Sequence, residues 1–220
     1  MRSFAVCAAA TRRAIVAAMF GLMLIPAAEA ATAPPPAALT PEDTLILQRV
    51  AAYLNGIRTM TAHFTQRAGN GVVTGNLWVS RPGRMRFEYN PPSPILLIAD
   101  TFYVYYYDKQ LRQVQQVGLK STPAWLLLRD PITFGSDVIV TRFERRPNQV
   151  LITVVERAHP DSGTLTMAFS ENPMALQGWT IVDQRGKVIS VSLSDLQFGM
   201  ALDPRLFQYQ APYTSHRESN

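Results

Sequence analysis

Short segments in which apolar and polar residues alternate follow one another from residue 60 to residue 198. An alternation with a period of two is typical of β-strands that bury one face. The connections are mostly turn clusters of two to six residues, such as Gly69-Asn70-Gly71, and connections this short join antiparallel neighbours. The sequence therefore predicts an antiparallel meander of eleven strands at residues 60–65, 72–80, 84–90, 95–99, 102–107, 111–117, 138–144, 150–157, 164–170, 179–183 and 188–198.

One helix is expected before the strands and helical structure interrupts them. Thr40 as N-cap, Pro41 at the first helical position and Asp43 three residues after the cap form a helix start. Apolar residues then recur every three or four positions as far as Asn55-Gly56, and they include Ile46, Val50, Tyr53, Leu54 and Ile57. We expect one or two short helices at residues 121–134, around the apolar run 125–128.

A large antiparallel sheet twists and curls, and its concave face needs a cover. The amphipathic helix and the short helical segment can supply it. We therefore expect a mainly β protein with a helical lid (α+β). Its architecture is a curved antiparallel half-barrel of about eleven strands whose concave face is covered by short helices. Periodicity alone leaves open whether the space beneath the cover is solid core or a ligand cavity.

The first thirty residues have the pattern of an export signal. Arg2, Arg12 and Arg13 precede an apolar stretch at 14–28, and Ala28-Glu29-Ala30 fits a signal-peptidase site. The stretch is shorter than the roughly 20 residues needed to span a membrane. We predict a cleaved signal peptide at 1–30, a flexible proline-rich leader at 31–39 with no core to join, one domain at 40–213 and a flexible tail at 214–220. The general and the twin-arginine export routes both remain open.

Composition and motifs exclude several function classes. The formal net charge of +5 is small and scattered, so nucleic acid is not an expected partner. The single cysteine, Cys7, lies in the predicted signal, which leaves no disulfide, thiolate metal site or cysteine nucleophile. His63, His159 and His216 are expected at the solvated surface. No hydrolase or nucleotide-binding motif is present, and we expect no catalytic residue, metal or cofactor.

Alternation assigns several side chains to faces of the predicted sheet. Met85, Phe87 and Tyr89 alternate with polar residues, and Leu77, Val79 and Arg81 share one face of the preceding strand. The tyrosines of 102–107 fit either ordinary cross-strand packing or a cavity wall. Likewise, the run 125–128 fits either a core helix or a movable plug.

Several short motifs occur in the order and spacing of one known family. They are Phe64-x-Gln66, Gly75-x-Leu77-Trp78-Val79-x-Arg81-Pro82, Phe87-x-Tyr89-x-x-Pro92, Ile98-x-Asp100, Tyr105-x-Tyr107-Asp108, Thr122-Pro123-Ala124-Trp125-Leu126-Leu127 and Asp203-x-x-Leu206-Phe207-x-Tyr209-x-x-Pro212. This ordered set resembles the LolA-type periplasmic outer-membrane lipoprotein carriers from about Leu45 to Tyr213. The sequence departs from the family pattern at Asp100-Thr101, where Asp-Gly is usual, and in its proline-rich leader.

The resemblance implies a monomeric periplasmic carrier that holds lipoprotein acyl chains in an apolar cavity. Its implied partners are an inner-membrane ABC-type release complex and an outer-membrane lipoprotein receptor, and no cofactor is implied. It implies that Arg81 acts as a latch by donating to free carbonyl groups of the lid. The residues expected to line the cavity are Leu77, Val79, Met85, Phe87, Tyr89, Tyr103, Tyr105, Trp125 and Leu126.

Three alternatives remain open at this point. The same half-barrel could serve as a periplasmic sensing or binding module without a transport role. The chain could be a periplasmic hydrolase, or a structural interaction module that binds no ligand.

Overall fold

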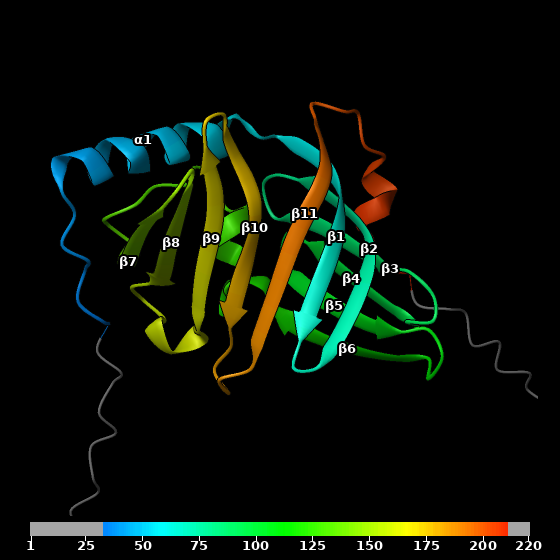
Figure 1. The fold of residues 1–220 in the computed structure, drawn as a ribbon. Coiled ribbons are helices and arrows are strands. Elements are labelled where there is room, and N and C mark those ends of the chain that lie inside the picture. Colours follow the sequence, from blue (N-terminus) through cyan, green and yellow to red (C-terminus); the bar gives the residue numbers. More distant parts are fainter. Residues whose placement is uncertain (1–32, 211–220) are drawn as a thin grey trace, which may run out of the picture. The chain divides into compact units, whose positions relative to one another are not determined.

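The computed structural model describes residues 33–210, and its main element is one antiparallel sheet of eleven strands (Figure 1). The strand order is β6-β5-β4-β3-β2-β1-β11-β10-β9-β8-β7, so most neighbours in the sheet are also neighbours in the chain. The prediction of an eleven-stranded antiparallel meander is confirmed. The strands are β1 (Thr59–Ala68), β2 (Gly71–Ser80), β3 (Arg84–Tyr89), β4 (Ile95–Asp100), β5 (Tyr103–Asp108), β6 (Gln113–Gly118), β7 (Val138–Arg146), β8 (Gln149–Glu156), β9 (Thr164–Glu171), β10 (Met174–Val182) and β11 (Val188–Phe198).

The sheet curls but does not close, because β6 and β7 are its two free ends and do not pair with each other. The first and last strands, β1 and β11, pair in the middle of the sheet. Figure 1 shows the curl: β9, β10, β11, β1 and β2 lie in front, and β4 to β6 lie behind them. The expected curved half-barrel is therefore present.

Two helices cover the concave face. Helix α1 (Pro41–Gly56) begins at the predicted N-cap, where the Thr40 side chain accepts a hydrogen bond from the Asp43 N–H and Asp43 bonds back to Thr40. The second, α2 (Trp125–Leu128), is a single turn that follows the 3₁₀ turn η1 (Leu119–Ser121). Two further 3₁₀ turns are η2 (Pro160–Ser162) and η3 (Pro204–Phe207).

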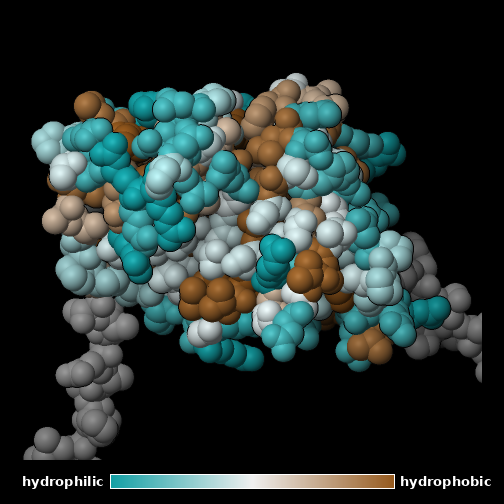
Figure 2. Space-filling model, in the orientation of Figure 1, coloured by the Kyte–Doolittle hydropathy of each residue, from teal (hydrophilic) through white to brown (hydrophobic). Residues whose placement is uncertain are grey.

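The core lies between the concave face and these helices. Ile46, Val50 and Leu54 of α1 and all three leucines of α2 belong to one buried cluster with the inward residues of the strands. On the other face, η3 packs against β3 and β4. Figure 2 shows that the face of the sheet seen in this view carries mostly hydrophilic and near-neutral residues with scattered apolar patches, as expected for a sheet with one solvated face.

Two details differ from the sequence prediction. The leader was expected to have no core to join, but Ala37 and Leu39 pack against the core, and the Ala37 N–H donates to the Val140 carbonyl at 2.8 Å. The edge strand β7 offers unpaired backbone groups, which explains this contact. Strand β10 begins five residues earlier than predicted because a bulge between Leu176 and Gly178 breaks the alternation.

The predicted signal peptide lies outside the described residues, as does the tail at 214–220. Among the residues described, no helix has the length and apolarity to cross a membrane. Residues 33–210 also contain no group of three or more acidic, histidine or cysteine side chains placed to hold a metal ion.

Candidate functional site

The turn between β2 and β3 brings a buried arginine against both helices of the concave face. Arg81 is 9% exposed, and its Nη1 donates to the carbonyl oxygens of Leu54 and, at 3.3 Å, Ile57, at the end of α1. Its Nε, at 3.2 Å, and its Nη2 donate to the carbonyl oxygen of Arg129, which caps the end of α2. One guanidinium therefore ties the two helices to each other and to the sheet.

The same turn satisfies a further carbonyl group of α2. The Gly83 N–H donates to the Leu128 carbonyl oxygen at 2.9 Å. The last carbonyl groups of a helix have no partner within the helix, so they need donors from elsewhere. In α2, Arg81 and Gly83 provide those donors from the β2–β3 turn.

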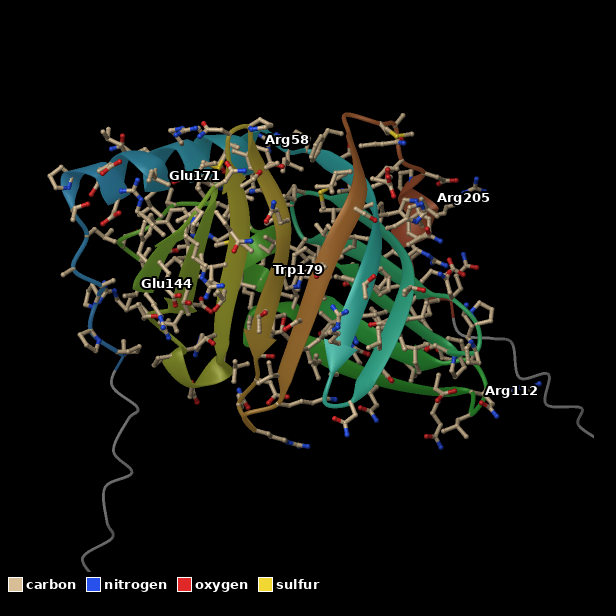
Figure 3. The ribbon with its side chains drawn as sticks, viewed as in Figure 1. Arg58, Arg112, Glu144, Glu171, Trp179 and Arg205 are labelled. Carbon is tan, nitrogen blue, oxygen red and sulfur yellow. The ribbon has the colours of Figure 1, made fainter. Side chains whose placement is uncertain are left out.

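A second set of contacts joins α1 to the loop after α2. The Asn55 side chain donates to the Ile132 carbonyl at 2.9 Å and accepts from the Ile132 N–H at 2.8 Å. Arg58 forms an ion pair with Asp130, and Figure 3 shows Arg58 just after α1. The lid formed by α1, α2 and the loop 129–132 is thus cross-linked by polar contacts at the end of α1.

The guanidinium of Arg81 keeps its charge in a buried place. Burial lowers the pKa of Arg81 from its ordinary value, and Asp130 opposes this shift. The nearest carboxylate oxygen, Asp130 Oδ1, is 3.9 Å away, so the close partners are uncharged carbonyl groups. A buried charge held mainly by backbone carbonyls is stabilised only while those carbonyls stay in position.

Beside Arg81, the apolar space between the lid helices and the sheet is almost completely filled. It leaves a cavity of about 20 Å³. This is room for about one water molecule, so an acyl chain cannot enter it in this conformation. The lining residues are Leu54, Ile57, Met60, Val79, Arg81, Leu127 and Leu176.

Most residues predicted for the cavity lie on the concave face. Leu77, Val79, Met85, Phe87 and Tyr89 are all buried in the core cluster there. Leu126 is buried beside them, and Trp125 is partly buried with Lys120 5.4 Å from the centre of its ring. The structure therefore brings seven of the nine predicted lining residues into one inner layer.

Next to the lid region, the inner layer becomes aromatic. The centre of the Phe64 ring lies 4.7 Å from that of Phe87 and 5.1 Å from that of Tyr89. The ring centres of Phe87 and Trp179 of β10 are 6.2 Å apart. Gly75 makes room for Phe64, because a Cβ at this position would lie 2.7 Å from the Phe64 ring. The Tyr89 hydroxyl donates to Gln66 at 2.8 Å, and burial raises the pKa of Tyr89 to about 12.

The prediction that Tyr103 and Tyr105 line the cavity is wrong. Tyr105 pairs with Ile98, which pairs with Arg86, and these residues lie on the outer face. There the ring of Tyr105 stacks on Tyr209 beyond η3, with 5.0 Å between ring centres. The inward residues of β5 are Val104 and Tyr106, since the strand register places them opposite Ala99 and Leu97.

Five lining residues were not predicted for the site. Leu54 and Ile57 were recognised only as part of the apolar stripe of α1, and Met60 only as an alternating strand residue. Leu127 directly follows the predicted Leu126. Leu176 could not be assigned to a strand from the sequence, because the bulge before Gly178 interrupts the alternation at the start of β10.

An open, curled antiparallel sheet whose concave face is covered by helices bonded to one buried arginine defines a class of lidded half-barrel proteins. The family model for the outer membrane lipoprotein carrier protein LolA matches residues 55–210. The chain therefore belongs to the LolA family.

Curated relatives agree with this assignment. The chain is 32% identical to an outer-membrane lipoprotein carrier protein of Legionella pneumophila, over 72% of this chain and 82% of that protein. It is 27% identical to the protein of the same name in Methylococcus capsulatus, over 77% and 86% of the two chains. Among solved structures, a LolA superfamily protein from Nitrosomonas europaea is similar with a TM-score of 0.41 and 10% identity, over 74% of this chain and 97% of that one.

Proposed function

We propose that this protein carries lipoproteins by enclosing their acyl chains between the concave face and the helical lid. The observation that carries the proposal is the Arg81 latch, which closes an apolar interior with bonds to both lid helices. Membership of the LolA family supports the lipoprotein cargo, as do relatives named outer-membrane lipoprotein carrier proteins. No catalytic role is proposed for any residue.

The energetics of acyl chains explain why a closed state is useful. Each buried methylene is worth about 0.8 kcal/mol, so free acyl chains insert into the nearest membrane or aggregate. A carrier must therefore offer an apolar interior. It must also release the chains. A stable empty state makes release more favourable, because the protein's own side chains fill the interior and their burial offsets the free energy lost when the acyl chains leave.

In this scheme, loading separates the lid from the sheet and breaks the bonds of Arg81. The interior then opens beyond its present 20 Å³. Delivery restores the bonds to the carbonyl groups of Leu54, Ile57 and Arg129. We propose an inner-membrane ABC-type complex as donor and an outer-membrane lipoprotein receptor as acceptor, with the carrier monomeric and periplasmic between them.

The test is Arg81→Leu in a reconstituted transfer assay from loaded carrier to receptor. Without the guanidinium, the carbonyl groups at the ends of both lid helices lose their donors, which costs about 1–3 kcal/mol for each buried group. The closed state is then less stable, so we expect a transfer rate at least ten-fold lower while binding of a triacylated lipopeptide is retained.

The matched control is Arg86→Leu. Arg86 is also a partly buried arginine on this hairpin, but it donates to the outer segment η3 through the Leu206 carbonyl at 3.2 Å. It should transfer cargo at the parent rate. Equal transfer by both variants and the parent would count against the latch, and lipopeptide binding without any transfer by the parent would favour a sensing or binding module.

A further inference from the structure

The two free ends of the sheet are protected very differently. Strand β7 carries Arg142, Glu144, Arg145 and Arg146, contains a bulge after Val140, and is contacted by the backbone of Ala37. Figure 3 shows Glu144 on this strand. Charges, bulges and covering segments are the usual means of preventing an edge strand from pairing with another chain.

Strand β6, at the other end, has no charge, no bulge and, among residues 33–210, no backbone segment bonded to its outer side. Its sequence Gln-Val-Gln-Gln-Val-Gly contains no charge and no proline, and its pairing with β5 is regular from Gln113 to Gly118. Residues 113–117 are all exposed, including Val114 at 45% and Val117 at 50%. An uncovered, regular and uncharged edge is a template for strand addition.

The register shows which backbone groups are available. The Leu119 N–H donates to the Phe102 carbonyl at 2.8 Å, and hydrogen-bonded pairs alternate along an antiparallel ladder. Val117 and Gln115 therefore bond to β5. The N–H and C=O groups of Val114 and Gln116 and the N–H of Gly118 point away from the sheet, while the Gly118 carbonyl accepts from the Ser121 hydroxyl at 2.8 Å.

Two basic residues flank β6, and they favour a negative charge on a segment that pairs with this strand. Arg112 lies in the turn before β6 and projects outward in Figure 3, and Lys120 follows the strand. Both are exposed, and within residues 33–210 neither forms an ion pair. A complementary segment is extended and uncharged along β6, with an acidic residue at one end.

The place of β6 in the fold indicates which polypeptide could supply the added strand. The chain runs from β6 directly into η1 and the lid helix α2. On the concave side, Tyr106 and Val117 beside this edge are exposed, whereas Val104 next to them belongs to the core cluster. The apolar inner face thus meets solvent next to β6, and a lipid chain that entered the interior from this side would leave its attached peptide at this rim.

We infer that β6 pairs with the extended segment that directly follows the lipid-bearing residue of the cargo, adding a strand to the sheet. This inference rests on the proposed carrier function. Backbone pairing suits a carrier of many proteins, because it reads extended conformation and tolerates different side chains.

The test uses a synthetic peptide with a triacylated N-terminal cysteine followed by Ser-Thr-Val-Ser-Thr-Ser-Asp, and the full chain. On binding, amide hydrogen exchange at Val114, Gln116 and Gly118 should slow at least ten-fold. Gln116→Pro removes one outward N–H and should weaken binding at least five-fold, whereas Gln116→Val keeps that donor and should bind within two-fold of the parent. Replacing the terminal aspartate of the peptide with lysine should also weaken binding.

The outcomes separate the two proposals. If the lipopeptide binds while β6 amides exchange as before, strand addition is wrong and the carrier function stands; this exchange measurement needs no variant. If the lipopeptide does not bind at all, both are overturned. Protection of β6 in a dimer without peptide would assign the edge to a second copy and overturn the inference.

Discussion

The inner and outer covers of the sheet are each held by an arginine of the β2–β3 hairpin, but the two arginines have different partners. Arg81 donates to three carbonyl groups of the lid, and its nearest carboxylate oxygen is 3.9 Å away. Arg86 donates to one carbonyl group of η3 and forms an ion pair with Glu88 at 3.0 Å. The Arg81 bonds therefore all break when the lid moves, whereas Arg86 keeps its ion pair whether or not η3 moves.

The difference fits the proposed carrier function, in which the inner cover opens and the outer cover stays in place. The inner helices enclose a nearly filled apolar interior, and the polar contacts that join α1 to α2 and the loop after it lie at the end of α1. The outer cover instead buries Phe207 to 2% exposure in a segment packed on β3 and β4. Apolar burial of this kind contributes to the stability of the fold whether or not cargo is bound.

The largest expected effect tests the fixed role of the outer cover. Phe207→Ala should lower the free energy of unfolding by about 3–5 kcal/mol, since a fully buried aromatic side chain is lost. Chemical denaturation measures this change, and binding of a triacylated lipopeptide to the folded protein should be unchanged. The exposed neighbour change Gln208→Ala should lie within about 0.5 kcal/mol of the parent. Lost binding in a stable Phe207→Ala protein would show that the outer cover belongs to the site.

A smaller effect is expected at the contact between α1 and the loop after α2. Asn55→Ala removes both bonds to Ile132 and should destabilise lid closure by about 1–2 kcal/mol. Amide hydrogen exchange at Leu128 and Arg129 should then be about 5–30 times faster. The half-buried Asn76 lies on the outer face of β2, and Asn76→Ala should leave those rates unchanged. Unchanged lid exchange in Asn55→Ala would mean that the bonds between Asn55 and Ile132 do not hold the lid.

The sheet could be predicted from the sequence because the position of each strand depends on a local pattern of residues. Alternation in several segments, together with the turn clusters between segments, identified all eleven strands, and the Thr40 capping box fixed the start of α1. The faces of β2 and β3 followed from the same alternation. It did not decide which face of β5 points inward, because Tyr103, Tyr105 and Tyr106 are all amphipathic rings and only the pairing with β4 separates them. The contacts of Arg81 with Leu54 and Arg129 join residues 27 and 48 positions apart, and no local pattern encodes them.

The smallest expected effect concerns the ion pair of the outer cover. Glu88 accepts from Arg86 and from Lys109 at 3.3 Å. Burial raises the pKa of Glu88, but the hydrogen bonds and charges of Arg86 and Lys109 outweigh burial and hold this pKa below its ordinary value. A depressed folded-state pKa means that the contribution is present above the unfolded value and is lost as the pH falls through the folded value.

Glu88→Gln should therefore lower the free energy of unfolding at pH 7 by less than about 1 kcal/mol, because the pair is partly exposed and screened by water. Urea denaturation at pH 7 and at pH 3 measures the difference between variant and parent, which should shrink toward zero at the lower pH. Hydrogen exchange of the lid amides should be the same in both proteins at pH 7, since the carbonyl acceptors of Arg81 carry no titrating group. A change in lid exchange on Glu88→Gln would show that the two covers are coupled through the β2–β3 hairpin, and the distinction between a moving and a fixed cover would fail.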